Sequence, residues 1–96
     1  MSVAAWKRNA PAGARLRVVE NTFLPARTGS LNTLVRTTGS SITYLPDSGG
    51  DGRPETFPTK GATVNDAGQL VCPHPNARRA AEGHTVTFEI EEAGRG

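Results

Sequence analysis

The stretch His84-Thr85-Val86-Thr87-Phe88-Glu89-Ile90-Glu91-Glu92 alternates apolar and polar side chains over most of its length. A period of two is the spacing of a β-strand that buries one face. We therefore expect Val86, Phe88 and Ile90 to point into a core and the threonines and glutamates to point outward. This stretch predicts an antiparallel β-protein whose sheet is buried on one side.

Shorter stretches with strand character precede it. Strands are expected at 15–23, 31–38, 41–45, 55–57 (with 63–64 as an extension of that strand) and 69–72, and a helical turn is expected at 77–82. Gly39-Ser40 predicts a tight turn between the second and third strands, and Val19 breaks the alternation of the first, which indicates a bulge or burial on both faces. The sequence thus predicts one small β-barrel domain of five to six strands at 15–92, an N-terminal arm at 1–14 that Trp6 anchors, and a tail at 93–96.

The composition excludes several classes of protein. The chain has 96 residues, 35% of them apolar, and its 11 Gly and 7 Pro argue against a helical bundle. No apolar run approaches the roughly 20 residues of a membrane span, and the single cysteine, Cys72, excludes an internal disulfide framework. Lys7 and Arg8 stand where the apolar part of a signal peptide would run, so we expect a cytoplasmic protein.

The charge is unevenly distributed. Residues 1–46 hold six basic side chains and one acid, whereas residues 47–96 hold five basic side chains and eight acids. This asymmetry suggests a basic face that contacts nucleic acid or an acidic partner. The candidate contacts are Arg15, Arg17 and Arg36 on the strands, Lys7 and Arg8 in the arm, and Trp6 and Tyr44 as rings that stack on bases. An alternative is that Glu89 and Glu91 lie opposite Arg15 and Arg17 across paired strands and neutralise them.

Two short segments resemble a family of small proteins. Arg17-Val18-Val19-Glu20-Asn21-Thr22, followed by Pro25 and Gly29, resembles the opening of small SH3-like barrel proteins encoded by phages and prophages. Phe57-Pro58-Thr59-Lys60-Gly61-Ala62 resembles their segment after the third strand, and 83–91 would be their closing strand. The resemblance covers about 15–91 and implies an SH3-like barrel and a bacterial host. It implies no activity, and the glycine-rich insert at 47–52 and the unusual segment at 72–75 depart from the family pattern.

Other residues suggest chemistry less strongly. Cys72, His74 and His84 are metal-ligand types, but three ligands at this spacing match no standard zinc site. Cys72 beside a histidine could be a nucleophile, although an inert cysteine at a strand end is the simpler interpretation. Gly49-Gly50-Asp51-Gly52 lacks the lysine of a phosphate-binding loop. We therefore expect neither an enzyme nor a cofactor or metal site.

Three functional classes remain open from the sequence. The first is a binding module that acts through the basic face. The second is an accessory or anti-defence protein that holds a host protein through an edge strand or through the apolar loop Phe23-Leu24-Pro25. The third is a sponge for a small nucleotide. The oligomeric state is not predicted.

Overall fold

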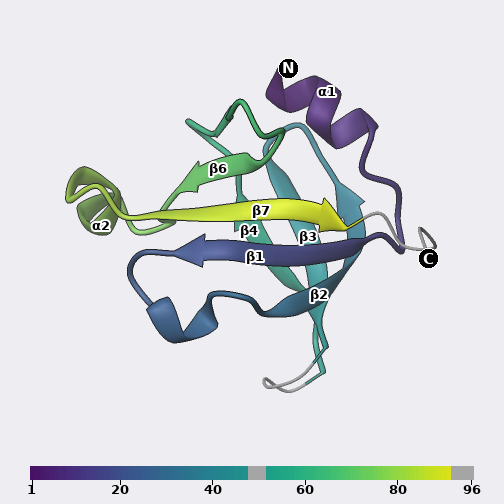
Figure 1. The fold of residues 1–96 in the computed structure, drawn as a ribbon, viewed down its shortest axis with the longest axis horizontal. Coiled ribbons are helices and arrows are strands. Elements are labelled where there is room, and N and C mark those ends of the chain that lie inside the picture. Colours follow the sequence, from purple (N-terminus) through teal and green to yellow (C-terminus); the bar gives the residue numbers. More distant parts are fainter. Residues whose placement is uncertain (48–51, 92–96) are drawn as a thin grey trace.

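The computed structural model describes residues 1–47 and 52–91, which form a mostly β structure with antiparallel strand pairs (Figure 1). In chain order the elements are α1 (Val3–Arg8), β1 (Arg15–Asn21), the 3₁₀ helix η1 (Pro25–Arg27), β2 (Leu31–Thr37), β3 (Ser41–Pro46), β4 (Glu55–Pro58), β5 (Thr63–Val64), β6 (Leu70–Pro73), α2 (Ala77–Ala81) and β7 (Thr85–Glu91). In this part of the chain, no helix is long and apolar enough to cross a membrane.

The seven strands form one curled sheet in the order β4-β3-β2-β1-β7-β6-β5. The predicted count of five to six strands is therefore wrong: Thr63 and Val64 do not extend β4 but form β5 and pair with β6. The separation arises at the turn after Pro58, where the Ala62 N–H donates to Thr59 O at 3.0 Å and Gly61 adopts a φ of +76°. Among the described residues β4 and β5 are not paired with each other, so the sheet does not close into a complete barrel.

The pairing of β1 with β7 brings the predicted first and last strands together. Arg15 lies opposite Glu91 and Arg17 opposite Glu89, and the register shifts between Val18 and Glu20. The shift confirms the expected irregularity at Val19. The hairpin predicted around Gly39-Ser40 is also present, since β2 and β3 pair in an antiparallel register.

The core lies on the concave side of the sheet. Phe88, Leu16, Ile42 and Leu70 have no exposed surface, and Leu34 is 1% exposed. These side chains come from strands β1, β2, β3, β6 and β7, so the curled sheet buries its apolar residues against itself.

The expected N-terminal arm contains a short helix that packs on the core. The Ser2 hydroxyl accepts the Ala5 N–H at 3.0 Å and caps α1, while Trp6 is only 4% exposed within the core cluster. Lys7 Nζ fixes the same helix to the sheet by donating to Thr38 O and Thr59 Oγ1, both at 2.7 Å. Helix α1 therefore covers one end of the curled sheet (Figure 1).

Candidate functional site

The predicted basic face is largely engaged in internal contacts. Arg15 donates to Thr33 Oγ1 at 2.9 Å and to Asp47 Oδ1 at 3.0 Å, and it forms an ion pair with Asp47. Hydrogen bonding from Arg15 lowers the pKa of the Asp47 carboxyl. Arg17 Nε donates to Glu91 Oε1 at 3.0 Å in a second ion pair. The alternative of cross-strand neutralisation by the last strand thus holds for Arg17, whereas the partner of Arg15 is an aspartate that follows β3.

The other predicted contacts do not gather on one surface. Trp6 is buried, and Tyr44 is 8% exposed with its ring in the core, which corrects the expectation that these rings stack on bases at a surface. Lys7 is held by α1 against the sheet, and burial lowers its pKa. Arg8 and Arg36 are exposed. Arg8 is at the end of α1, and Arg36 lies on β2 opposite Thr43.

A cavity of about 560 Å³ opens at the end of the curled sheet where β1 ends and β2 and β7 begin. Its wall includes Tyr44 and Phe57 from β3 and β4, Val18 and Val86 from β1 and β7, and Arg27 from η1. Polar side chains also line it, namely Asn21, Ser30, Asn32, Glu55 and His74. A concave site of this size, with an apolar wall and a few polar groups, is typical of a small-molecule site.

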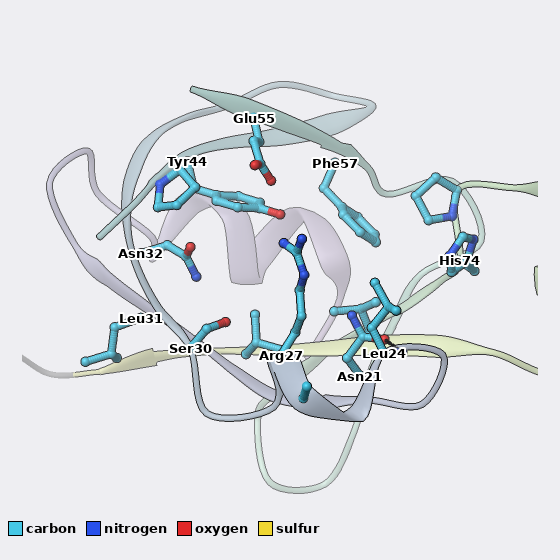
Figure 2. A pocket seen from close by; sticks show the side chains of 15 residues that line it. Asn21, Leu24, Arg27, Ser30, Leu31, Asn32, Tyr44, Glu55, Phe57 and His74 are labelled. Atoms are coloured by element: carbon cyan, nitrogen blue, oxygen red, sulfur yellow. Dashed lines mark hydrogen bonds between the residues drawn. The ribbon is translucent and has the colours of Figure 1, made fainter. Parts of the chain in front are cut away.

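The loop between β1 and β2 places Arg27 over this cavity. Asn21 Oδ1 accepts the N–H groups of Phe23 at 3.1 Å and Leu24 at 2.8 Å, which turns the chain out of β1. Pro25 then begins η1, and the Gly29 N–H donates to Val18 O at 2.6 Å, which returns the loop to β1. Figure 2 shows the Arg27 side chain extending into the cavity, with its guanidinium between Tyr44 and Phe57 and below Glu55.

Aromatic rings form one wall of the cavity. The rings of Phe57 and Phe88 pack edge to face with centroids 5.1 Å apart, and Tyr44 lies 5.8 Å from Phe88. Burial, followed by the negative charge of Glu55, raises the pKa of Tyr44 to about 12. The phenol is therefore a neutral hydroxyl at physiological pH, able both to donate and to accept a hydrogen bond.

The two histidines lie around an aromatic ring. Phe23 packs edge to face against His74 and His84, with centroids 5.0 and 5.2 Å away, and the Arg79 guanidinium lies 4.7 Å from its centroid. His74 Nδ1 accepts the Asn76 N–H at 3.0 Å, which fixes the orientation of this ring.

Cys72, the third residue of the metal hypothesis, has no exposed surface, and burial raises its pKa to about 12. Its thiol is therefore protonated at physiological pH and is a poor nucleophile there. In 1–47 and 52–91 no group of three or more His, Cys, Asp or Glu residues could hold a metal ion. Gly49, Gly50 and Asp51 of the glycine-rich loop lie outside the described residues, as do Glu92 and the tail at 93–96.

Sequence reasoning missed most of this cavity. It named Tyr44, but as a surface ring, and it did not include Arg27 among the candidate contacts. Glu55 and Phe57 gave no signal beyond a short strand. Comparison of the chain with known proteins found no matching family model, no matching curated protein and no matching solved structure.

Proposed function

We propose that the protein is a non-enzymatic binding module whose ligand occupies the cavity between η1 and β4. The observation that carries the proposal is the cavity itself, where Arg27 and Glu55 extend from different elements toward the same space beside Tyr44 and Phe57 (Figure 2). Neither charged side chain takes part in the ion pairs found among the described residues. The Glu55 carboxylate, which also accepts a hydrogen bond from the Tyr44 hydroxyl, keeps further acceptor sites, and the Arg27 guanidinium offers several N–H donors to a ligand.

A blocking variant tests this assignment. Ala26 lines the cavity and is exposed, so Ala26→Trp places a large ring at the opening without disturbing the core. Ala4 is exposed on α1, which covers the other end of the sheet, so Ala4→Trp is the matched control. A thermal-shift screen of nucleotides, amino acids and organic acids should yield ligands that raise the melting temperature of the wild type and of Ala4→Trp but not of Ala26→Trp. Ligands that stabilise all three proteins equally would overturn the assignment.

The basic-face hypothesis is a second proposal with less support. Arg15, Arg17 and Lys7 already have partners, which leaves Arg8 and Arg36 as exposed contacts from the predicted set. If this face bound nucleic acid, affinity would be greatest at about 50 mM salt and would fall in Arg8→Gln and Arg36→Gln. It would be unaffected by Ala26→Trp, so the two proposals give opposite results with the same variants.

The second functional class, capture of a host protein, would use an edge of the sheet or the apolar loop. The edges are β4 and β5, of which β4 ends at Pro58 and β5 has two residues, so both offer little backbone for strand addition. In the loop, Phe23 packs against both histidines, whereas Leu24 is 46% exposed beside the cavity. These features give this class less support than the cavity has.

We also propose that the curled sheet is a variant of the SH3-like barrel and that the protein is of phage or prophage origin. The support is the pairing of β1 with β7, the β2–β3 hairpin and the two segments that resemble those proteins. A bacterial cytoplasm would then be its place of action.

A further inference from the structure

Two complementary groups face the same cavity. Arg27 offers several N–H donors in a planar fork, and Glu55 offers two carboxylate oxygens that only accept. In Figure 2 both side chains point toward the space beside the Tyr44 hydroxyl, and one comes from η1 while the other comes from β4. A ligand that satisfies both groups must present acceptors to one and donors to the other.

The lining also balances in charge. Arg27 and Glu55 are the residues of opposite formal charge in the wall. A polyanion would gain little from such a wall, because attraction to the guanidinium is offset by repulsion from the carboxylate. The partly exposed ring of Phe57 in the wall instead favours a flat ligand.

We infer that the cavity binds a nucleobase and is selective for guanine, an inference that rests on the proposed function. Guanine carries the acceptors O6 and N7 on one edge, which match a guanidinium, and N1–H with the N2 amino group on the next edge, which match a carboxylate. Adenine places the acceptor N1 beside its amino group, so it would leave one carboxylate oxygen facing an acceptor. Cytosine likewise places an acceptor beside its amino group, and uracil has a single N–H between two carbonyls. Neither base therefore offers two adjacent donors to the carboxylate.

The assigned roles follow from these edges. Glu55 accepts from N1–H and N2–H, Arg27 donates to O6 and N7, and the base lies in the open part of the cavity beside Phe57. The base could belong to a free guanine nucleotide or to an unpaired guanine in a single strand. Both present the same edges to the cavity, so the test includes an arm for each source.

The test is calorimetric titration with the four ribonucleoside monophosphates. Guanosine monophosphate should bind at least roughly tenfold more tightly than the adenine, cytosine and uracil nucleotides, which is the discrimination a bidentate pair supplies. Glu55→Gln replaces one acceptor by a donor, so it should remove most of this preference, and Arg27→Gln should weaken guanine binding. Arg78→Gln, on α2 outside the cavity wall, is the charge-matched control for Arg27 and should bind as the wild type does.

A second titration identifies the source of the base. It compares guanosine monophosphate with an oligothymidine that carries one central guanine and with the all-thymine strand. Equal affinity for the nucleotide and the guanine-containing strand indicates a free nucleotide, and tighter binding of that strand than of either other probe indicates an unpaired guanine.

Equal affinity for all four nucleotides, undetectable binding of all of them, or a guanine preference that survives Glu55→Gln would overturn the inference. The proposed function fails separately, when ligands from the wider screen stabilise Ala26→Trp as much as the wild type.

Discussion

Lys7 was predicted from the sequence to contact a ligand, whereas the structure gives it a role in holding α1. Its ammonium donates to the backbone oxygen of Thr38 and to the hydroxyl of Thr59, both at 2.7 Å. Thr59 is 6% exposed and follows β4, so these bonds join the N-terminal helix to two distant parts of the chain. Lys7→Met keeps much of the apolar stem and removes the charge and both bonds.

The expected loss is about 2 kcal/mol. Hydrogen bonds to a charged group contribute about 1.5–3 kcal/mol each. Burial lowers the pKa of Lys7, which means that desolvation of its ammonium offsets part of this gain, and the side chain is half-buried. We therefore expect the two hydrogen bonds of Lys7, less the cost of desolvation, to contribute about as much as one hydrogen bond to a charged group. In a domain of this size, that loss lowers the melting temperature by roughly 8–16 °C.

Thermal and urea unfolding followed by circular dichroism measure this loss. Arg8→Met is the matched control, since Arg8 is exposed on the same helix and its loss should change stability by less than about 0.5 kcal/mol. A double-mutant cycle with Thr59→Val should give a coupling energy of about 1 kcal/mol between the two side chains. If Lys7→Met and Arg8→Met unfold at the same temperature, the assigned role of Lys7 is wrong.

Three further predictions concern a core ring and three ionisable side chains. Phe88→Ala should cost about 3–5 kcal/mol in urea unfolding because the ring is fully buried, and a cost below about 1 kcal/mol would contradict the packing described. The pKa values of Cys72 and Tyr44 rise from 9.0 and 10.0 to about 12, so the unfolded chain ionises first and stability should fall as the pH rises from 9 toward 12. Cys72→Val should make that decline shallower, and an unchanged slope would refute the thiol contribution. The pKa of Asp47 is lowered by Arg15, so its contribution is present above the unfolded pKa, near 3.8, and is lost as the pH falls through the lower folded value. Asp47→Asn should therefore flatten the acid side of the stability curve in denaturant titrations, which a curve parallel to the wild type would contradict.

The strands could be predicted because their alternation is local. In β7 and β1 the positions two apart share a face, and the structure buries Val86 and Phe88 in one strand and Leu16 and Val18 in the other. The separate strand β5 was not predicted, because two residues carry no periodicity. Its pairing depends on the turn at Gly61, whose positive φ the sequence does not reveal.

The cavity could not be predicted for a different reason. Its wall combines η1 with β4 and the ends of other strands, so no contiguous pattern describes it. Tyr44 was predicted to stack on bases at a surface, and alternation alone does not show that its ring is buried beside a cavity. Arg27 lies in a loop whose path depends on the Asn21 turn and on the return of Gly29 to β1.

Strand pairing accounts for part of the charge asymmetry of the chain. The antiparallel pairing of β1 with β7 places a basic strand from residues 1–46 beside an acidic strand from residues 47–96. Part of the excess positive charge of residues 1–46 is therefore neutralised by an ion pair within the sheet. A basic residue in a strand has cross-strand neighbours with which it can form ion pairs. A basic residue in a connecting loop has no such neighbour set by strand pairing. Arg27 is such a loop cation, and the loop directs it into the cavity, beside the rings of β3 and β4. Of the basic residues in the N-terminal half, Arg15 and Arg17 thus form ion pairs at the sheet, whereas Arg27 lines the cavity.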